Sequence, residues 1–129
     1  MDNTLVLILK KKWYDMITSS VKREEYREIT PYWAARLLGE VEYSEDESVN
    51  EIHALRETYF RGMAPEEIQR LMHDGVLAPR HTYVTFYHGY AKNRPAATYE
   101  VTDIAIGPGR LALGAERGRI YFVIKIKDL

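Results

Sequence analysis

The chain carries the segment Val21-Lys22-Arg23-Glu24-Glu25-Tyr26-Arg27-Glu28-Ile29, and the elements around it depend on whether it is a helix or a strand. The helix propensity of its Glu, Lys and Arg residues favours a helix. A strand would instead place Glu25 and Arg27 on one face and Lys22 on the other. Lys22 can then share a cleft with the other two only if it precedes the strand, in the turn that leads into it. The periodicity alone leaves both readings open.

The residues before this segment predict a strand and a helix. Residues 5–9 form a continuous apolar run, which favours a buried strand. The run is too short to span a membrane, is followed at once by three lysines, and has no positive segment before it, so we expect neither a membrane anchor nor a signal peptide. Residues 11–19 have apolar side chains at helical spacing, and the pair Ser19-Ser20 ends the predicted amphipathic helix.

The middle of the chain reads as mainly helical. Thr30 is a predicted N-cap, and Pro31 is then the first residue of a short helix that ends at Gly39. The pattern further predicts a solvated acidic loop at 40–50, a helix at 50–60, a helix from Ala64-Pro65 to Gly75, and a connector at 76–80.

The last third reads as sheet. Strands are expected at 82–88, at 97–106 with a bend near Asp103, and at 120–126, with glycine-rich turns at 107–109 and 114–118. These glycines lack a following Lys-Ser/Thr and a following helix, so they are not a phosphate-binding loop. The order of elements predicts an α+β fold, a mostly antiparallel sheet closed into a β-barrel and decorated by short helices. With 129 residues, we expect a single domain spanning 1–129.

Composition narrows the possible chemistry. The chain has no cysteine, which excludes disulfides, thiolate nucleophiles and zinc–cysteine sites. A net charge of −1 argues against non-specific coating of duplex DNA, although a local basic patch is still sufficient for one nucleotide. The four histidines lack the spacing of a helical metal motif, so no metal and no cofactor are expected. A cytoplasmic location is the expectation from these features.

Residues 17–27, Ile-Thr-Ser-Ser-Val-Lys-Arg-Glu-Glu-Tyr-Arg, resemble the signature of the ASCH domain family, part of the PUA-like superfamily. In that signature a short helix ends in a small residue, and x-Lys-x-x-(Glu or Thr)-x-Arg then runs into a strand. Residues 5–9 are similar to the first barrel strand of the family and residues 121–126 to the closing strand. The resemblance implies a bacterial or phage-type member with a helical insertion at about 36–80, and it favours a strand for residues 24–29.

The resemblance also implies two kinds of activity. PUA-like domains bind RNA, whereas some ASCH members are amidohydrolases that remove the acetyl group from acetylcytidine nucleosides, and others are ribonucleases. In the hydrolases a lysine, a threonine three residues later and a distant glutamate form the active site. Lys22 matches the lysine, Arg27 matches a substrate-side arginine, and Glu116 is a candidate for the distant glutamate. Glu25 stands where the threonine would be, and a carboxylate does not simply replace a hydroxyl nucleophile, so binding ranks ahead of hydrolysis.

The chemistry of these side chains suits an RNA or modified-nucleoside ligand. Arginine makes planar, bidentate contacts to phosphate, lysine supplies a point charge, and a glutamate can accept from the amine of cytosine. Tyrosines offer stacking surfaces for bases, although barrel core is their commoner role. The alternative for the charged residues is an exposed ion-pair ladder of little energetic value. The expected ligand-binding residues are Lys22, Glu25, Arg27, Tyr26, Tyr32 and Tyr90.

Three functional hypotheses follow. The first is a module that binds RNA or a modified nucleoside through a basic cleft. The second is an amidohydrolase or ribonuclease with Lys22, Glu25 and Glu116 as catalytic groups. The third is a protein-interaction role for the helical insertion and its acidic loop. The sequence predicts no membrane partner and leaves the oligomeric state open.

Overall fold

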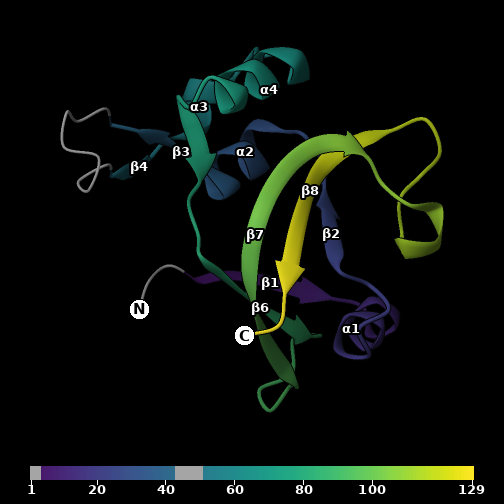
Figure 1. Cartoon of the computed structure of the whole chain (residues 1–129). Helices are drawn as coiled ribbons and strands as arrows, with labels where there is room; N and C mark the ends of the chain where they lie inside the picture. The colour runs from purple at the N-terminus through teal and green to yellow at the C-terminus, as the bar shows by residue number, and fades with distance from the viewer. Residues whose placement is uncertain (1–3, 43–50) are drawn as a thin grey trace. The chain divides into compact units, whose positions relative to one another are not determined.

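The computed structural model describes residues 4–42 and 51–129, so most of the expected acidic loop lies outside the described residues (Figure 1). The chain divides into two units. The first combines both ends of the chain, Met1–Arg27 and His81–Leu129, and the second is Glu28–Arg80. The predicted strand, helix, strand order at the start of the chain and the predicted strands at its end therefore build one unit together.

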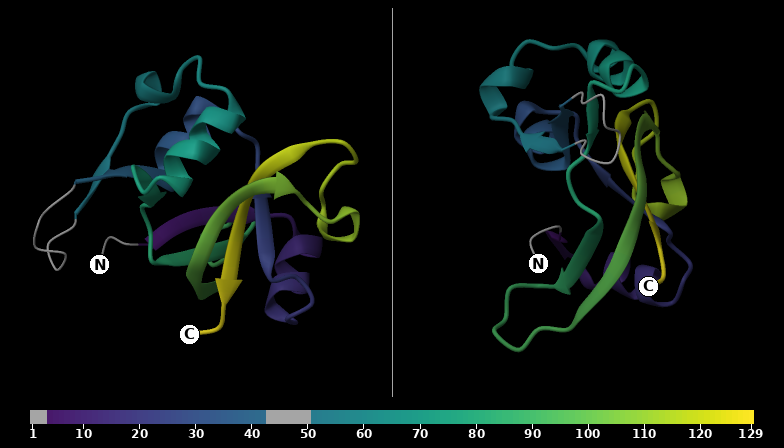
Figure 2. Two further views of the ribbon diagram at one scale, coloured as in Figure 1. Left: turned by 45° about the horizontal axis from the view of Figure 1, so that its top comes forward. Right: turned by 60° about the vertical axis from the view of Figure 1, so that its left-hand side comes forward.

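The first unit is a curled, mostly antiparallel sheet with short helices. This confirms the prediction of an α+β fold. Its strands follow the order β1-β6-β7-β8-β2. The neighbours β1 and β6 are parallel, and the other three pairings are antiparallel. Figures 1 and 2 show the long strand β7 bending through the sheet. The strands are β1 (Thr4–Leu9), β2 (Glu24–Arg27), β6 (Tyr83–His88), β7 (Ala96–Pro108) and β8 (Ile120–Lys127).

A break in register explains part of the curl. The β7–β8 register shifts between Val101 and Asp103, which is the position of the predicted bend. An extra residue on one strand of an antiparallel pair bends that strand and increases its twist. Apolar side chains pack on both faces of β8, because the four consecutive residues 121–124 are all buried. In β1, Leu5, Leu7 and Leu9 are buried while Val6 is 53% exposed.

The helix α1 (Lys11–Thr18) follows β1 after one residue, and the turn behind it places Lys22. Ser20 takes a left-handed conformation with φ of 66°. The backbone N–H groups of Val21 and Lys22 both donate to the carbonyl of Met16, each at 2.9 Å. These bonds close the helix and leave Lys22 just before β2, outside the alternation of the strand.

The described part of the second unit has a small antiparallel sheet of order β4-β3-β5 and three short helices. Its elements are α2 (Pro31–Leu37), β3 (Leu38–Val41), β4 (Ile52–Ala54), α3 (Glu57–Phe60), α4 (Pro65–His73) and β5 (Leu77–Pro79). The predicted cap is present, because Thr30 Oγ1 accepts a hydrogen bond from the Trp33 N–H at 3.2 Å. Gly75, with φ of 78°, follows the end of α4 as expected.

Several predictions for this unit are wrong. The segment 50–60 is not one helix but the strand β4 followed by α3, and the connector 76–80 contains β5. Gly39 does not end a helix; it lies in β3, paired with Ala54. A Cβ at Gly39 would lie 2.5 Å from Ile52 Cγ2 and 2.6 Å from the carbonyl oxygen of His53, so the absence of a side chain permits this close pairing. Strand pairing thus overrides the local helical pattern.

Every helix in the described part of the chain is too short or too polar to cross a membrane.

Candidate functional site

A pocket of about 330 Å³ lies in the first unit, and residues from both edge strands of the sheet line it. The curl of the sheet therefore brings β1 and β2, which lie at opposite ends of the strand order, to the same pocket. Its volume is within the usual range of small-molecule sites. The lining residues are Ile8, Leu9, Lys10, Trp13, Lys22, Glu25, Tyr26, Arg27, Leu113, Gly114 and Tyr121.

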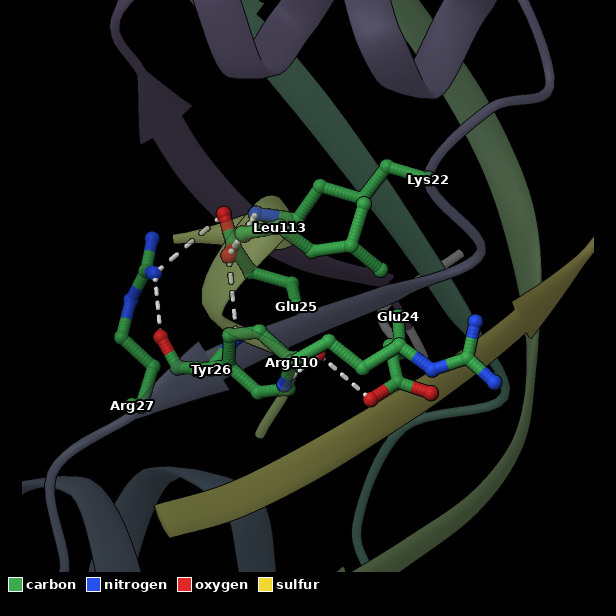
Figure 3. Close-up of polar contacts among 7 residues, drawn as sticks. All are labelled: Lys22, Glu24, Glu25, Tyr26, Arg27, Arg110 and Leu113. Atoms are coloured by element: carbon green, nitrogen blue, oxygen red, sulfur yellow. Dashed lines mark hydrogen bonds and ion pairs between the residues drawn. The ribbon is translucent and has the colours of Figure 1, made fainter. Parts of the chain in front are cut away.

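Lys22 is the most deeply buried charged side chain of the pocket, with 1% of its surface exposed. Its Nζ donates to Glu25 Oε1 at 2.9 Å and to the carbonyl oxygen of Leu113 at 2.7 Å (Figure 3). The ammonium also lies 4.6 Å from the centroid of the Trp13 ring, which gives a cation–π contact. An ammonium has three N–H donors. One of them is therefore left without an oxygen or nitrogen acceptor among the described residues.

Glu25 connects two of the cationic side chains that line the pocket, Lys22 and Arg27. Its Oε1 accepts from Lys22 Nζ and from the backbone N–H of Tyr26, both at 2.9 Å, and its Oε2 lies 3.4 Å from Arg27 Nη1. Arg27 Nη1 also donates to the carbonyl oxygen of Tyr26 at 2.8 Å. The side chains of Glu25 and Arg27 are 5% and 17% exposed. The three charged residues thus form one contiguous chain with an excess of one positive charge.

The burial of these three charged side chains contradicts the alternative of an exposed ion-pair ladder. A surface pair is worth little because water screens it, whereas a buried charge is tolerated only when it is paired and hydrogen-bonded. Lys22 and Glu25 are almost fully buried and each has at least two hydrogen bonds. The predicted condition for their meeting holds, because Lys22 precedes β2.

Tyr26 forms part of the pocket wall and is held by its hydroxyl group. Tyr26 Oη donates to Glu24 Oε2 at 2.6 Å and accepts from the backbone N–H of Arg110 at 3.0 Å. Burial, and secondly the hydrogen bond to Glu24, raise the pKa of Tyr26 to about 12. The ring packs against Tyr121, with centroids 5.6 Å apart, in a small apolar cluster that also contains Leu113. Tyr26 is therefore a fixed wall of the pocket.

Sequence reasoning missed Trp13, Leu113 and Tyr121 as site residues. Trp13 belongs to the apolar face of the predicted helix. That pattern indicates a core residue and does not distinguish it from a residue that lines a pocket. Its ring packs against Gly114, where an added Cβ would lie 3.1 Å from Trp13 Cζ2. Leu113 contributes its carbonyl oxygen to Lys22 across 91 positions of sequence. No local motif indicates such a contact.

The remaining expected site residues lie elsewhere. Tyr90 is 83% exposed and lines a neighbouring pocket that shares the residues at the end of β1. Glu116 donates its backbone N–H to Tyr121 Oη, while its carboxylate pairs with Arg119 at 3.1 Å in solvent. Tyr32 belongs to α2 in the second unit. The structure therefore brings together Lys22, Glu25, Tyr26 and Arg27 but not these three.

The pocket is poorly suited to a metal ion, since its one carboxylate lies between two cations. In the second unit Glu42, Glu51 and His53 have ligand atoms within 4.8 Å of one another, and His53 Nε2 lies 2.8 Å from Glu42 Oε2. All three side chains are exposed. Such an exposed acidic group is common without an ion, so it does not identify a metal centre.

In chemical terms, the pocket of the first unit offers cationic donors, one carboxylate acceptor and aromatic walls. This combination suits a polar, partly anionic ligand with a planar group. No protein-family model matches the chain, and comparisons with curated proteins and with solved structures find no match.

Proposed function

We propose that the first unit binds a nucleobase, either of single-stranded RNA or of a modified nucleoside, in the pocket around Lys22. The observation that carries the proposal is the buried chain Lys22–Glu25–Arg27 at a pocket that Trp13 also lines. The curled, mostly antiparallel sheet is consistent with a PUA-like barrel of the ASCH type. A cytoplasmic location, where such ligands occur, belongs to the same proposal.

The polar groups of the pocket match the edge of a base. One N–H of the Lys22 ammonium has no acceptor among the described residues, and Glu25 carries two acceptor oxygens. A base with adjacent carbonyl and amine groups, such as cytosine, presents the complementary pair. Stacking on an aromatic ring contributes about 1–3 kcal/mol per base. Arg27, whose side chain is more exposed than that of Glu25, would contact the phosphate or the ribose of the ligand.

The local nature of the charge agrees with a small ligand. The whole chain carries a net charge of −1, so long-range attraction to a duplex is weak. Lys22, Glu25 and Arg27 instead carry their charges in a largely buried group, where these charges act at short range and are less screened by salt.

Fluorescence titration tests this proposal. A Trp33→Phe background leaves Trp13 as the reporter, to be titrated at low salt with cytidine, acetylcytidine and short single-stranded RNAs. Arg27→Ala is expected to weaken binding about tenfold or more, as lost charged hydrogen bonds do. The control is Arg23→Ala, because Arg23 pairs with Asp128 at 3.0 Å and does not line the pocket. The proposal would be wrong if no ligand changed the Trp13 fluorescence, or if Arg27→Ala and Arg23→Ala weakened binding equally.

A second candidate is amide hydrolysis of an acetylated nucleoside, and the direct contact of Lys22 with Glu25 favours it. Glu25 would take a proton from water, which adds to the acetyl carbonyl while Lys22 stabilises the oxyanion. Cleavage of the C–N bond would release acetate and the amine, which receives the proton. Glu116 takes no part in this version because it does not line the pocket.

Chromatography after incubation with acetylcytidine tests the second candidate. Production of cytidine by the wild type but not by Lys22→Ala supports hydrolysis. Binding of acetylcytidine without turnover by the wild type removes it and leaves the binding function intact.

A further inference from the structure

The second unit has a pocket of its own, of about 530 Å³, which is distinct from the site around Lys22. It lies against α2, α3 and the end of the segment that follows β5. The lining residues are Ala35, Arg36, Leu55, Arg56, Glu57, Thr58, Arg61 and Arg80.

The charges of this pocket run against those of the segment that contains it. Residues 28–80 carry eleven acidic side chains, five arginines and no lysine. Four of the five arginines line the pocket, and Glu57 is the one acid among the described residues that line it. Four of the five basic residues of this acidic segment therefore lie around one pocket.

Two of these arginines are held in place before any ligand arrives. The guanidinium of Arg36 lies 3.3 Å from the centroid of the Tyr32 ring, donates to the Tyr32 carbonyl oxygen at 3.0 Å and pairs with Glu57 Oε1 at 3.2 Å. Arg80 Nη1 donates to the carbonyl oxygen of Ala35. Groups that are already ordered lose little entropy when a ligand binds.

The other two arginines, Arg56 and Arg61, are exposed. The side chains of Arg56 and Arg61 make no hydrogen bond or ion pair with the residues that the structure describes. A guanidinium offers several N–H donors in a planar fork that matches two oxygens of a phosphate or carboxylate. The pocket therefore combines two arginines that are held in place, Arg36 and Arg80, with two exposed ones, Arg56 and Arg61.

We propose that this pocket binds a phosphomonoester group. A phosphomonoester carries a charge of about −1.5 to −2 at neutral pH and three acceptor oxygens, so it can satisfy several forks at once. A carboxylate is a poorer match, because it has one charge and because Glu57 already supplies one to Arg36. The proposal is independent of the nucleobase site of the first unit.

The test is a titration of the intact, isotope-labelled protein followed by the side-chain N–H signals of its arginines in NMR spectra. The probes are adenosine monophosphate and O-phosphoserine, which carry the same group on different carriers, with adenosine and acetate as controls. Arg56→Ala and Arg61→Ala are each expected to weaken phosphate binding about tenfold. Glu57→Gln is expected to tighten it, because the amide oxygen can still accept from Arg36 while the negative charge that repels the phosphate is removed.

Arg70→Ala is the matched control, since Arg70 is exposed in α4 of the same unit and lines a different pocket. Its binding should equal that of the wild type. Affinity should also rise between about pH 5 and pH 7, as the phosphate loses its second proton near pH 6. Similar affinity for both phosphates indicates recognition of the group itself, and a preference for one identifies its carrier.

Three results would overturn the proposal. The first is no shift with either phosphate at millimolar concentration and low salt. The second is an equal response of Arg70, which indicates general attraction of counter-ions. The third is binding of acetate or adenosine as tight as that of the phosphates. Because the substituted arginines are exposed, an unchanged backbone spectrum separates lost binding from lost folding.

Discussion

Replacing Glu25 by glutamine is the sharpest test of the buried charge chain. The change keeps the size of the side chain and removes its charge. Lys22 would then keep the Leu113 carbonyl and the Trp13 ring but lose its ionic partner, at a site where only 1% of its surface is exposed. Arg27 would lose its ionic partner as well, because its Nη1 lies 3.4 Å from Glu25 Oε2.

The expected loss of stability is large for a substitution of one atom. Removing one partner of a buried ion pair costs about 3–5 kcal/mol, because the remaining charge stays buried and uncompensated. Glutamine still offers one acceptor oxygen, so we expect Glu25→Gln to fall near 3 kcal/mol, the lower end of that range. A small domain has a total stability of about 5–15 kcal/mol, so the variant should still fold.

Urea denaturation of the first unit measures this loss. Trp13 reports on that unit in a Trp33→Phe background, and at about 1–3 kcal/mol per molar urea the midpoint should fall by roughly 1–3 M. Asp15→Asn is the control. Its partner Lys11 is closer, at 2.6 Å, but the two side chains are 72% and 54% exposed, so about 0.3–0.5 kcal/mol is expected.

The double variant Lys22→Met/Glu25→Gln completes the argument. If the two charges stabilise one another, it should be less destabilised than the sum of the single variants by about 1 kcal/mol or more. A loss of stability for Glu25→Gln no larger than that for Asp15→Asn, or additive effects of the two single variants, would contradict this prediction. Either result means that water reaches the pair and that burial does not set its energy.

Two further predictions concern the wall of the pocket. Gly109→Ala is expected to destabilise the first unit by about 1–3 kcal/mol through overpacking, because its Cβ would lie 2.6 Å from Ala115 Cβ and 2.8 Å from Tyr26 Cζ. Gly107→Ala, with open space around it, should cost far less in the same urea experiment. Tyr26 is expected to titrate with a pKa of about 12, seen as the difference in phenolate absorbance between wild type and Tyr26→Phe. Because this pKa lies above the ordinary value of 10.0, its contribution to stability is complete below pH 10 and is lost as the pH rises from about 10 to about 12. Tyr26→Phe should lack that part of the pH dependence, and an equal loss in both proteins would contradict the assignment.

The sequence predicted elements wherever a local signal and the tertiary contacts agree. Thr30 and Pro31 are a cap and a first helical residue, and the helix begins there. The segment at 50–60 shows the opposite case. Its apolar spacing favours a helix, but pairing with β3 makes Ile52–Ala54 a strand. A local pattern contains no information about that partner, so the prediction fails.

The site was predictable in part for the same reason. Lys22, Glu25 and Arg27 lie within six residues, so a motif could identify them. Their relative placement depends on the turn after α1, where Lys22 N–H bonds to Met16. The Leu113 carbonyl comes from the far end of the chain, and only the curled sheet brings it to Lys22. The sequence therefore indicates the charged residues of the pocket but not the carbonyl that completes it.

The energetics of the site bear on why the charges are there. Well-packed apolar residues in place of a buried ion pair are often neutral or stabilising by about 1–4 kcal/mol. Lys22 already lies beside apolar groups, because Tyr26 and Leu113, which it contacts, belong to a small apolar cluster. A fold selected for stability alone has little reason to keep a fully buried lysine at the wall of a hollow. We therefore propose that these charges are kept for an interaction with a ligand in the pocket rather than for their contribution to folding. This proposal requires that the wild type binds ligand and that a stably folded Lys22→Met/Glu25→Gln protein does not.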